Sequence, residues 1–210
     1  MGGHSLEASR QEKDLGVLID ENLKPSAQCA KAAAKPNMVL GQLTRGCTWR
    51  DPANLTNLYK VYVRPHLEYA QASWAPWKQA DIQLLEQVQH RFTRQVSGLG
   101  ALPYEERLKR LGLTTLQARR ERGDMIEAYM IITGKVDVDP NIWFNPLTNR
   151  EGAASTRSTT GQLMLARKNA KSEARLNQFT VRIVPKWNAL PDQVKMQPTL
   201  NFSKMPMTTH

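Results

Sequence analysis

The sequence has little that would support a metal site, a disulfide framework or a membrane span. Its two cysteines, Cys29 and Cys47, form no CxxC motif and have no paired histidines beside them, so neither a zinc knuckle nor a set of disulfides is indicated. No apolar run approaches the roughly 20 residues of a membrane-spanning helix, and the first residues lack the apolar core of a signal peptide. We therefore expect an intracellular protein, nuclear or cytoplasmic, with no membrane partner.

The sequence also lacks a pattern typical of an active site. It has no Asp-Asp pair, and only Asp137 and Asp139 stand close together, in a segment that reads as a solvated turn. Hard cations prefer several oxygen ligands that converge from separate elements. The four histidines are scattered, without a Ser-His-Asp or Cys-His order. We therefore predict no catalytic residue, no metal and no cofactor.

Acidic residues are few relative to basic ones. The 210 residues include 29 Lys and Arg against 19 Asp and Glu, a formal net charge of +10. Residues 150–210 carry ten of these basic residues and only three acids. This balance favours a polyanionic partner, although it says nothing about the fold.

The chain is predicted to be mainly α-helical, with a three-helix bundle near its start. The first helix is expected from Ser26, as N-cap, to about residue 46, with a kink or a break at Pro36. Its predicted apolar stripe consists of Cys29, Ala33, Met38, Val39 and Leu43.

The other two helices of the predicted bundle have clearer boundaries. Asp51 and Pro52 give the second helix a cap and a first-turn proline, and Pro65 should kink it. The third helix spans residues 79–96, with His90 and two arginines facing outward. The predicted core of the bundle includes Leu55, Leu58, Tyr62, Ile82, Leu85 and Phe92.

Composition divides the chain into five parts. Residues 1–25 have a disordered start and one short unpaired strand at 15–19, and residues 26–100 form the helical bundle. Residues 101–134 are a helical connector that ends at Gly134. Residues 135–173 are a long flexible basic linker, and residues 174–210 are a C-terminal helical segment and tail.

Basic side chains form three candidate nucleic-acid-binding groups, because Lys and Arg pair with phosphates without reading sequence. The first group is Arg107, Lys109, Arg110, Arg119, Arg120 and Arg122; the second is Arg157, Arg167, Lys168, Lys171 and Arg175; the third is Arg91 and Arg94. Interleaved acids leave a salt-bridged solvent face as the alternative for the first group. The second has few acids beside it, and its alternative is a linker that only adds solubility.

Seven sequence blocks occur in one order along the chain. They are KDLGVLID at 13–20, RPHLEY at 64–69, LLEQVQHR at 84–91, YEERL at 104–108, LGL at 111–113, RGD at 122–124 and WNALP at 187–191. In this order the blocks resemble the thumb and C-terminal region of reverse transcriptases from non-LTR retrotransposons, of the LINE type and jockey-like.

The resemblance implies a thumb-like helical bundle and a role beside a polymerase. Its similarity spans roughly residues 10–195 and does not include the catalytic palm, in which aspartates hold two divalent metals. It implies that the third helix follows a template–primer duplex by backbone and shape, and that strand 15–19 belongs to a palm sheet whose other strands are missing. We therefore expect binding of RNA or an RNA–DNA hybrid without catalysis.

Two alternatives remain open from the sequence. One is a helical interaction module that docks on another protein, such as a catalytic reverse transcriptase chain supplied in trans. The other is a non-functional, eroded copy, which is indicated by Pro36, by Pro185 and by a tail after residue 201 that does not read as helical.

The resemblance and the missing aspartate pair together give a first prediction. The purified chain should incorporate no nucleotide on a primed template with Mg²⁺ or Mn²⁺, because the two-metal site of the family has no counterpart in the sequence. Template-dependent primer extension by a clean preparation would contradict it.

Overall fold

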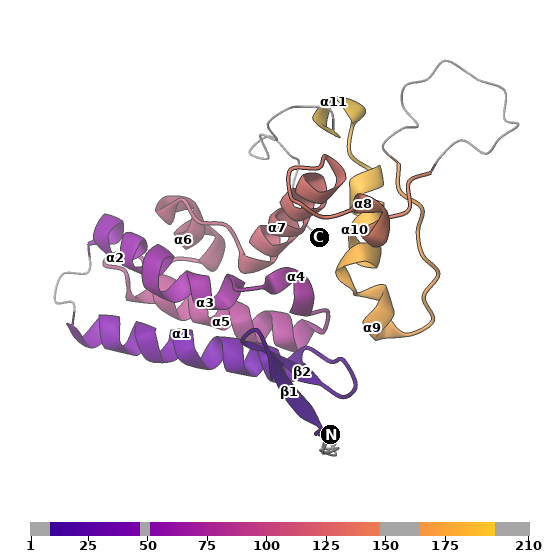
Figure 1. Ribbon diagram of the computed structural model, residues 1–210. Helices are drawn as coiled ribbons and strands as arrows, with labels where there is room; N and C mark the ends of the chain where they lie inside the picture. The colour runs from indigo at the N-terminus through magenta and orange to yellow at the C-terminus, as the bar shows by residue number, and fades with distance from the viewer. Residues whose placement is uncertain (1–8, 47–50, 148–163, 196–210) are drawn as a thin grey trace, which may run out of the picture. The chain divides into compact units, whose positions relative to one another are not determined.

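The computed structural model describes residues 9–46, 51–147 and 164–195, and the chain forms two compact units, Met1–Gln117 and Ala118–His210. Its described part is mainly helical and contains one two-stranded antiparallel sheet near the N-terminus (Figure 1). The predicted fold class, mainly α with a helical bundle, is confirmed.

The sheet is a β-hairpin. Strand β1 (Gln11–Asp14) pairs with β2 (Val17–Asp20), and the two connecting residues have positive φ angles, 43° at Leu15 and 89° at Gly16. Such a turn suits the right-handed twist of paired strands. The predicted unpaired strand at 15–19 was therefore wrong. Its partner escaped notice because every residue of β1 is exposed and polar.

Helix α1 (Ser26–Gly46) is continuous, so the predicted break at Pro36 was wrong. Pro36 is buried on the same face as Cys29, Ala33 and Leu40, and this packing offsets the roughly 3 kcal/mol that an interior proline costs. Ser26 is the first residue of the helix, and its hydroxyl donates to the side chain of Asp81.

The predicted apolar stripe of α1 is only partly correct. Cys29 and Ala33 are buried and Val39 and Leu43 are partly buried, whereas Met38 is exposed.

The second helical segment is divided into α2 (Pro52–Leu58), a π-helix η1 (Tyr59–Val63) and α3 (Arg64–Glu68), and a short helix α4 (Gln71–Trp74) follows. The predicted start is confirmed, because the Asp51 carboxylate accepts a hydrogen bond from the Asn54 amide at 3.1 Å. The π-helix lies directly before Pro65, where the wider turn accommodates the proline ring.

The π-helix also explains which side chains reach the core. Leu55, Tyr59, Val63 and Leu67 are buried at intervals of four residues. In an α-helix, side chains four residues apart are rotated by about 40° about the helix axis, because 3.6 residues complete a turn. The wider turn of the π-helix removes part of this rotation, so the four side chains stay on the core side while Tyr62 is 54% exposed.

The predicted core of the bundle is confirmed in part. Leu55, Leu85 and Phe92 are buried, whereas Leu58 and Ile82 are half-buried and Tyr62 was wrongly included.

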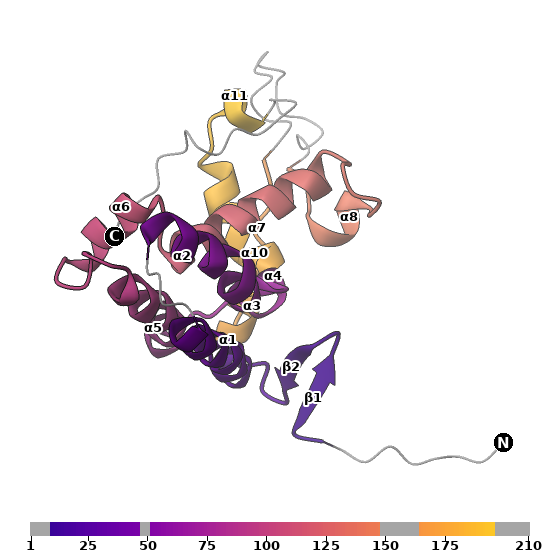
Figure 2. The ribbon, with the colours of Figure 1, turned by 90° about the vertical axis from the view of Figure 1, so that its left-hand side faces the viewer.

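Helix α5 (Gln79–Gln95) runs parallel to α1, and α2–α3 runs the opposite way, as the predicted three-helix bundle requires (Figures 1 and 2). Three side-chain hydrogen bonds join α1 to α5 along their length: Ser26 to Asp81, Arg91 to Asn37 and Thr44 to Gln95, at 2.7, 2.9 and 2.7 Å.

Two helices close at glycines in the left-handed conformation, and the one at Gly134 was predicted. Helix α6 (Tyr104–Leu111) ends at Gly112, with φ 59°. Helix α7 (Leu116–Ile132) is followed by Gly134, with φ 65°.

The second unit consists of most of α7 with α8 (Pro140–Trp143), α9 (Glu173–Leu176), α10 (Phe179–Asn188) and α11 (Asp192–Lys195). Buried apolar side chains hold it together, namely those of Met125, Ala128, Tyr129, Ile131, Phe144, Leu165, Phe179, Val181, Ile183, Val184 and Trp187. Phe144 and Leu165, which lie within the predicted linker 135–173, belong to this core.

The stripe of side chains buried at four-residue intervals predicts which substitutions destabilise the bundle. Replacing fully buried Leu67 by Ala should lower the free energy of unfolding by about 2–5 kcal/mol, measured by urea denaturation. Val61→Ala is the matched control, because Val61 lies in the same helical segment and is exposed, so its change should stay within about 0.5 kcal/mol. Equal destabilisation of the two variants would contradict the assignment of Leu67 to the core and of Val61 to the surface.

Candidate nucleic-acid interface

The outward surface of α1 and α5 is basic. Helix α1 contains three basic residues and no acid, and α5 contributes two exposed arginines. We define the α1–α5 face by the exposed side chains of Lys31, Lys35, Arg45, Arg91 and Arg94.

The two acids of α5 do not neutralise this face, because both are held on the inner side of the helix. Asp81 is buried and accepts the hydrogen bond of the Ser26 hydroxyl. The carboxylate of Glu86 accepts hydrogen bonds from the Leu116 amide, at 3.0 and 3.2 Å, and from the hydroxyl of Tyr104.

Contacts with neighbouring groups position two of the cations. Arg91 donates to the side chain of Asn37 and so lies across the junction of α5 with α1. The Lys31 ammonium donates to the carbonyl of Gly16 in the hairpin turn, at 2.8 Å. Guanidinium and ammonium groups have further donors, five and three in total, so both can still contact a phosphate.

A buried polar network holds α5 in this orientation. Gln89 is fully buried, and its Oε1 accepts a hydrogen bond from the Tyr59 hydroxyl at 2.8 Å. Its amide nitrogen donates to the Tyr104 hydroxyl at 2.9 Å and to the Thr114 carbonyl at 3.0 Å. Burial, followed by the neighbouring Glu86 carboxylate, raises the pKa of Tyr104 far above its usual range.

His90 belongs to this network, so its predicted outward position was wrong. The imidazole is half-buried and stacks on the ring of Tyr104, with 3.5 Å between centroids. Arg107 donates to the His90 carbonyl at 3.2 Å and lies 3.3 Å from Nδ1. Burial, then the charges of Arg107 and Arg94, lower the pKa of His90, while Glu105 opposes them.

The first predicted group of basic residues is only partly exposed to solvent. Arg107 and Arg120 are buried, which leaves their guanidinium groups inaccessible to a phosphate, so we exclude them from the interface. Lys109, Arg110 and Arg122 are exposed and Arg119 is half-buried. Arg110 forms an ion pair with Glu106 at 3.0 Å, as the salt-bridged alternative predicted.

The second predicted group lies in the second unit. Arg167, Lys171 and Arg175 are exposed, and Arg175 contacts the side chain of Gln178. Lys168 is half-buried and its ammonium donates to the Trp143 carbonyl at 3.2 Å. Arg157 lies outside the described residues.

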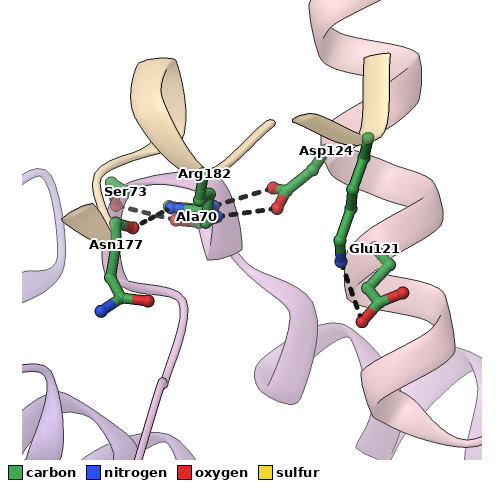
Figure 3. Close-up of polar contacts among 7 residues, drawn as sticks. Ala70, Ser73, Glu121, Asp124, Asn177 and Arg182 are labelled. Atoms are coloured by element: carbon green, nitrogen blue, oxygen red, sulfur yellow. Dashed lines mark hydrogen bonds and ion pairs between the residues drawn. The ribbon is translucent and has the colours of Figure 1, made fainter. Parts of the chain in front are cut away.

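An ion pair joins α7 to α10 in this unit (Figure 3). Arg182 donates from Nε and Nη2 to the two oxygens of Asp124, both at 2.9 Å, and from Nη1 to the Asn177 carbonyl at 2.8 Å. Lys186 and Glu121 form a more exposed pair at 3.0 Å. The bidentate pair fixes the two helices. Figure 3 also shows Ser73 donating to the Ala70 carbonyl at the start of α4 in the first unit.

The sequence analysis missed Lys31, Lys35 and Arg45, because they are spread over fifteen positions and separated by alanines and apolar residues. The absence of any acid from 21 consecutive residues was the signal that could have found them. These three residues become part of a basic surface only when α5 lies beside α1.

No family model, curated protein or solved structure matches this chain. Among the described residues, no three His, Cys, Asp or Glu side chains are grouped as a metal site. No helix in the described ranges is long and apolar enough to cross a membrane.

The environment of His90 predicts a pH-dependent stability. Its pKa is lowered in the folded state, so the unfolded chain binds more protons as the pH falls. The contribution of His90 should be present above its unfolded pKa of about 6.5 and should disappear as the pH falls below it. We expect urea midpoints to decrease from about pH 7 to pH 5, and His90→Gln to flatten this decrease.

His66 provides a comparison for this experiment. Burial and Lys35 also lower its pKa, so His66→Gln should remove a separate part of the pH dependence. An unchanged pH dependence in His90→Gln would rule out the role given to His90.

Proposed function

We propose that the chain binds RNA or an RNA–DNA duplex through the α1–α5 face, as a catalytically inactive region related to the C-terminal part of a LINE-type reverse transcriptase. The observation that carries this proposal is the α1–α5 face itself: five exposed cations on two parallel helices whose only acids are turned inward. Such a face attracts a polyanion and releases its counterions on contact.

The dimensions and chemistry of the face favour a duplex. Helix α1 has 21 residues and is therefore about 32 Å long, enough to extend past several phosphates of a duplex. Neither helix exposes a Phe, Tyr or Trp side chain, so unpaired bases have nothing on which to stack. Contacts to phosphates position a protein without reading bases.

The arrangement of the resembling blocks supports the family assignment that we propose. Blocks 13–20 and 64–69 meet where the Tyr69 hydroxyl donates to the Leu15 carbonyl at 2.8 Å. Blocks 84–91 and 104–108 meet in the network of Glu86, Tyr104 and Arg107. Residues that carry the resemblance thus make the contacts that hold the bundle together.

A second candidate function is docking on another protein, such as a catalytic reverse transcriptase chain. It is favoured by exposed apolar side chains around the hairpin, where Leu15 is 85% exposed and Ile19, Leu23 and Tyr69 are exposed beside it in the chain or in space. Binding to neither nucleic acid nor protein would favour the eroded copy.

The proposal is tested by neutralising the face. Changing Lys35, Arg45, Arg91 and Arg94 together to Gln should weaken binding to an RNA–DNA hybrid about equally for different sequences. The slope of log K against log salt should flatten by up to about 0.9 for each phosphate that the variant no longer neutralises. Lys31 is left intact because it contacts the hairpin.

The matched control neutralises four exposed basic residues elsewhere in the same unit: Arg10, Lys13, Lys24 and Lys78. It carries the same change in net charge and should bind almost as the parent does. If the two variants bind alike, net charge alone explains the affinity and the α1–α5 face is not the site.

A further inference from the structure

The second unit exposes an aromatic side chain beside a basic segment. Trp143, the last residue of α8, is 39% exposed, and Ile142 before it is 73% exposed. Contact between an apolar indole ring and water is unfavourable, and an exposed aromatic side chain beside cations often marks a binding site.

Neighbouring groups hold Trp143 in place. Its ring lies edge-on to the buried ring of Phe179, with 6.4 Å between centroids and an interplanar angle of 74°. Phe144, the next residue, is buried and also contacts Phe179 edge-on, at 5.9 Å. The exposed indole is therefore attached to the core of the unit and is restricted in motion.

The basic segment is fixed beside α8 by backbone pairing. Residues 164–171 contain three cations and no acid. Leu165 forms an antiparallel bridge with Pro146, and the Asn188 side chain on α10 both donates to and accepts from its backbone, at 2.9 Å each. This pairing brings the Lys168 ammonium to 3.2 Å from the Trp143 carbonyl.

We propose that Trp143, with Lys168 and Arg167, binds single-stranded nucleic acid, with an unpaired base stacked on the indole and a phosphate at the two cations. An aromatic face accepts any base, and a cationic segment follows the backbone. Lys168 uses one of its three donors on the Trp143 carbonyl and keeps the others for phosphate oxygens. Arg167 is exposed.

Acids near the site do not reverse its charge. Asp139 accepts hydrogen bonds from the amide and side chain of Asn141, at 2.9 and 3.0 Å, and so caps α8. Asp137 is exposed. The site differs in chemistry from the α1–α5 face, which has cations without exposed aromatic rings, and it does not depend on the function proposed for that face.

The test uses the full chain and a labelled oligouridylate of about 12 nucleotides, a length within the usual range of single-strand sites. Trp143→Ala should bind it roughly 5- to 150-fold more weakly, as expected when one base no longer stacks. The affinity for an RNA–DNA hybrid should not change. Tyr62→Ala is the control, because it removes an exposed aromatic ring from the first unit and should leave both affinities unchanged.

Trp143→Phe keeps the test decisive if the alanine variant is misfolded. Phe retains a ring for stacking, so binding should persist by fluorescence anisotropy, whereas the quenching of tryptophan emission by the oligonucleotide should disappear. Changing Arg167 and Lys168 to Gln should lower the salt slope by about 0.7 for each phosphate no longer neutralised. Quenching that persists in Trp143→Phe, or unchanged affinity in a folded Trp143→Ala, would overturn the proposal.

The α1–α5 face variant distinguishes this site from the function proposed above. If it loses hybrid binding and still binds oligouridylate through Trp143, both sites hold. If it binds the hybrid as the parent does, only the function proposed for the face fails. If oligouridylate binds neither the parent nor any variant, the proposed single-strand site is wrong, and the function proposed for the α1–α5 face is unaffected.

Discussion

The bundle depends on the buried amide of Gln89, which lies where α5, η1, α6 and the start of α7 meet. Its amide oxygen and nitrogen satisfy the hydroxyls of Tyr59 and Tyr104 and the carbonyl of Thr114. A buried amide without partners costs several kcal/mol in an apolar environment, so these elements must keep their spacing. Tyr59 reaches Gln89 from the π-helix and stacks on Phe92 at 4.1 Å, so the wide turn belongs to the same constraint.

This network also decides the charge of the surface. Glu86 lies one turn before the network on α5, and its carboxylate is occupied by Tyr104 and by the first amide of α7. Because that acid faces inward, the outward side of α5 retains only its arginines and polar residues. The carboxylate that accepts the first amide of α7 is thus one of the two α5 acids that are kept off the outward face.

In the second unit, a charged pair holds two helices together. Arg182 and Asp124 form a bidentate pair that is largely buried and links α7 to α10, while Arg167, Lys171 and Arg175 remain exposed. The chain's basic residues therefore belong to two groups. Arg107 and Arg182 hold elements together, and the exposed cations are accessible to a partner. Charge counted along the sequence does not separate these groups, since Arg107 follows two acids directly whereas the partner acid of Arg182 is 58 positions away.

The sequence by itself determined the helical class, the end of α7 near Gly134 and the cap at Asp51, because each depends on contacts within a few residues. It also determined part of the buried faces, through their periodicity. Only the tertiary structure decided that α1 continues through Pro36, that β1 pairs with β2, that Arg107 and Arg120 are buried and that His90 is half-buried. Packing offsets the cost of the proline, and the pairing of β1 needs no apolar pattern in that strand. Arg107 contacts the carbonyl and the ring of His90, which is 17 positions away in the sequence. The α1–α5 face has the same origin, since neither helix is a basic surface until the other lies beside it.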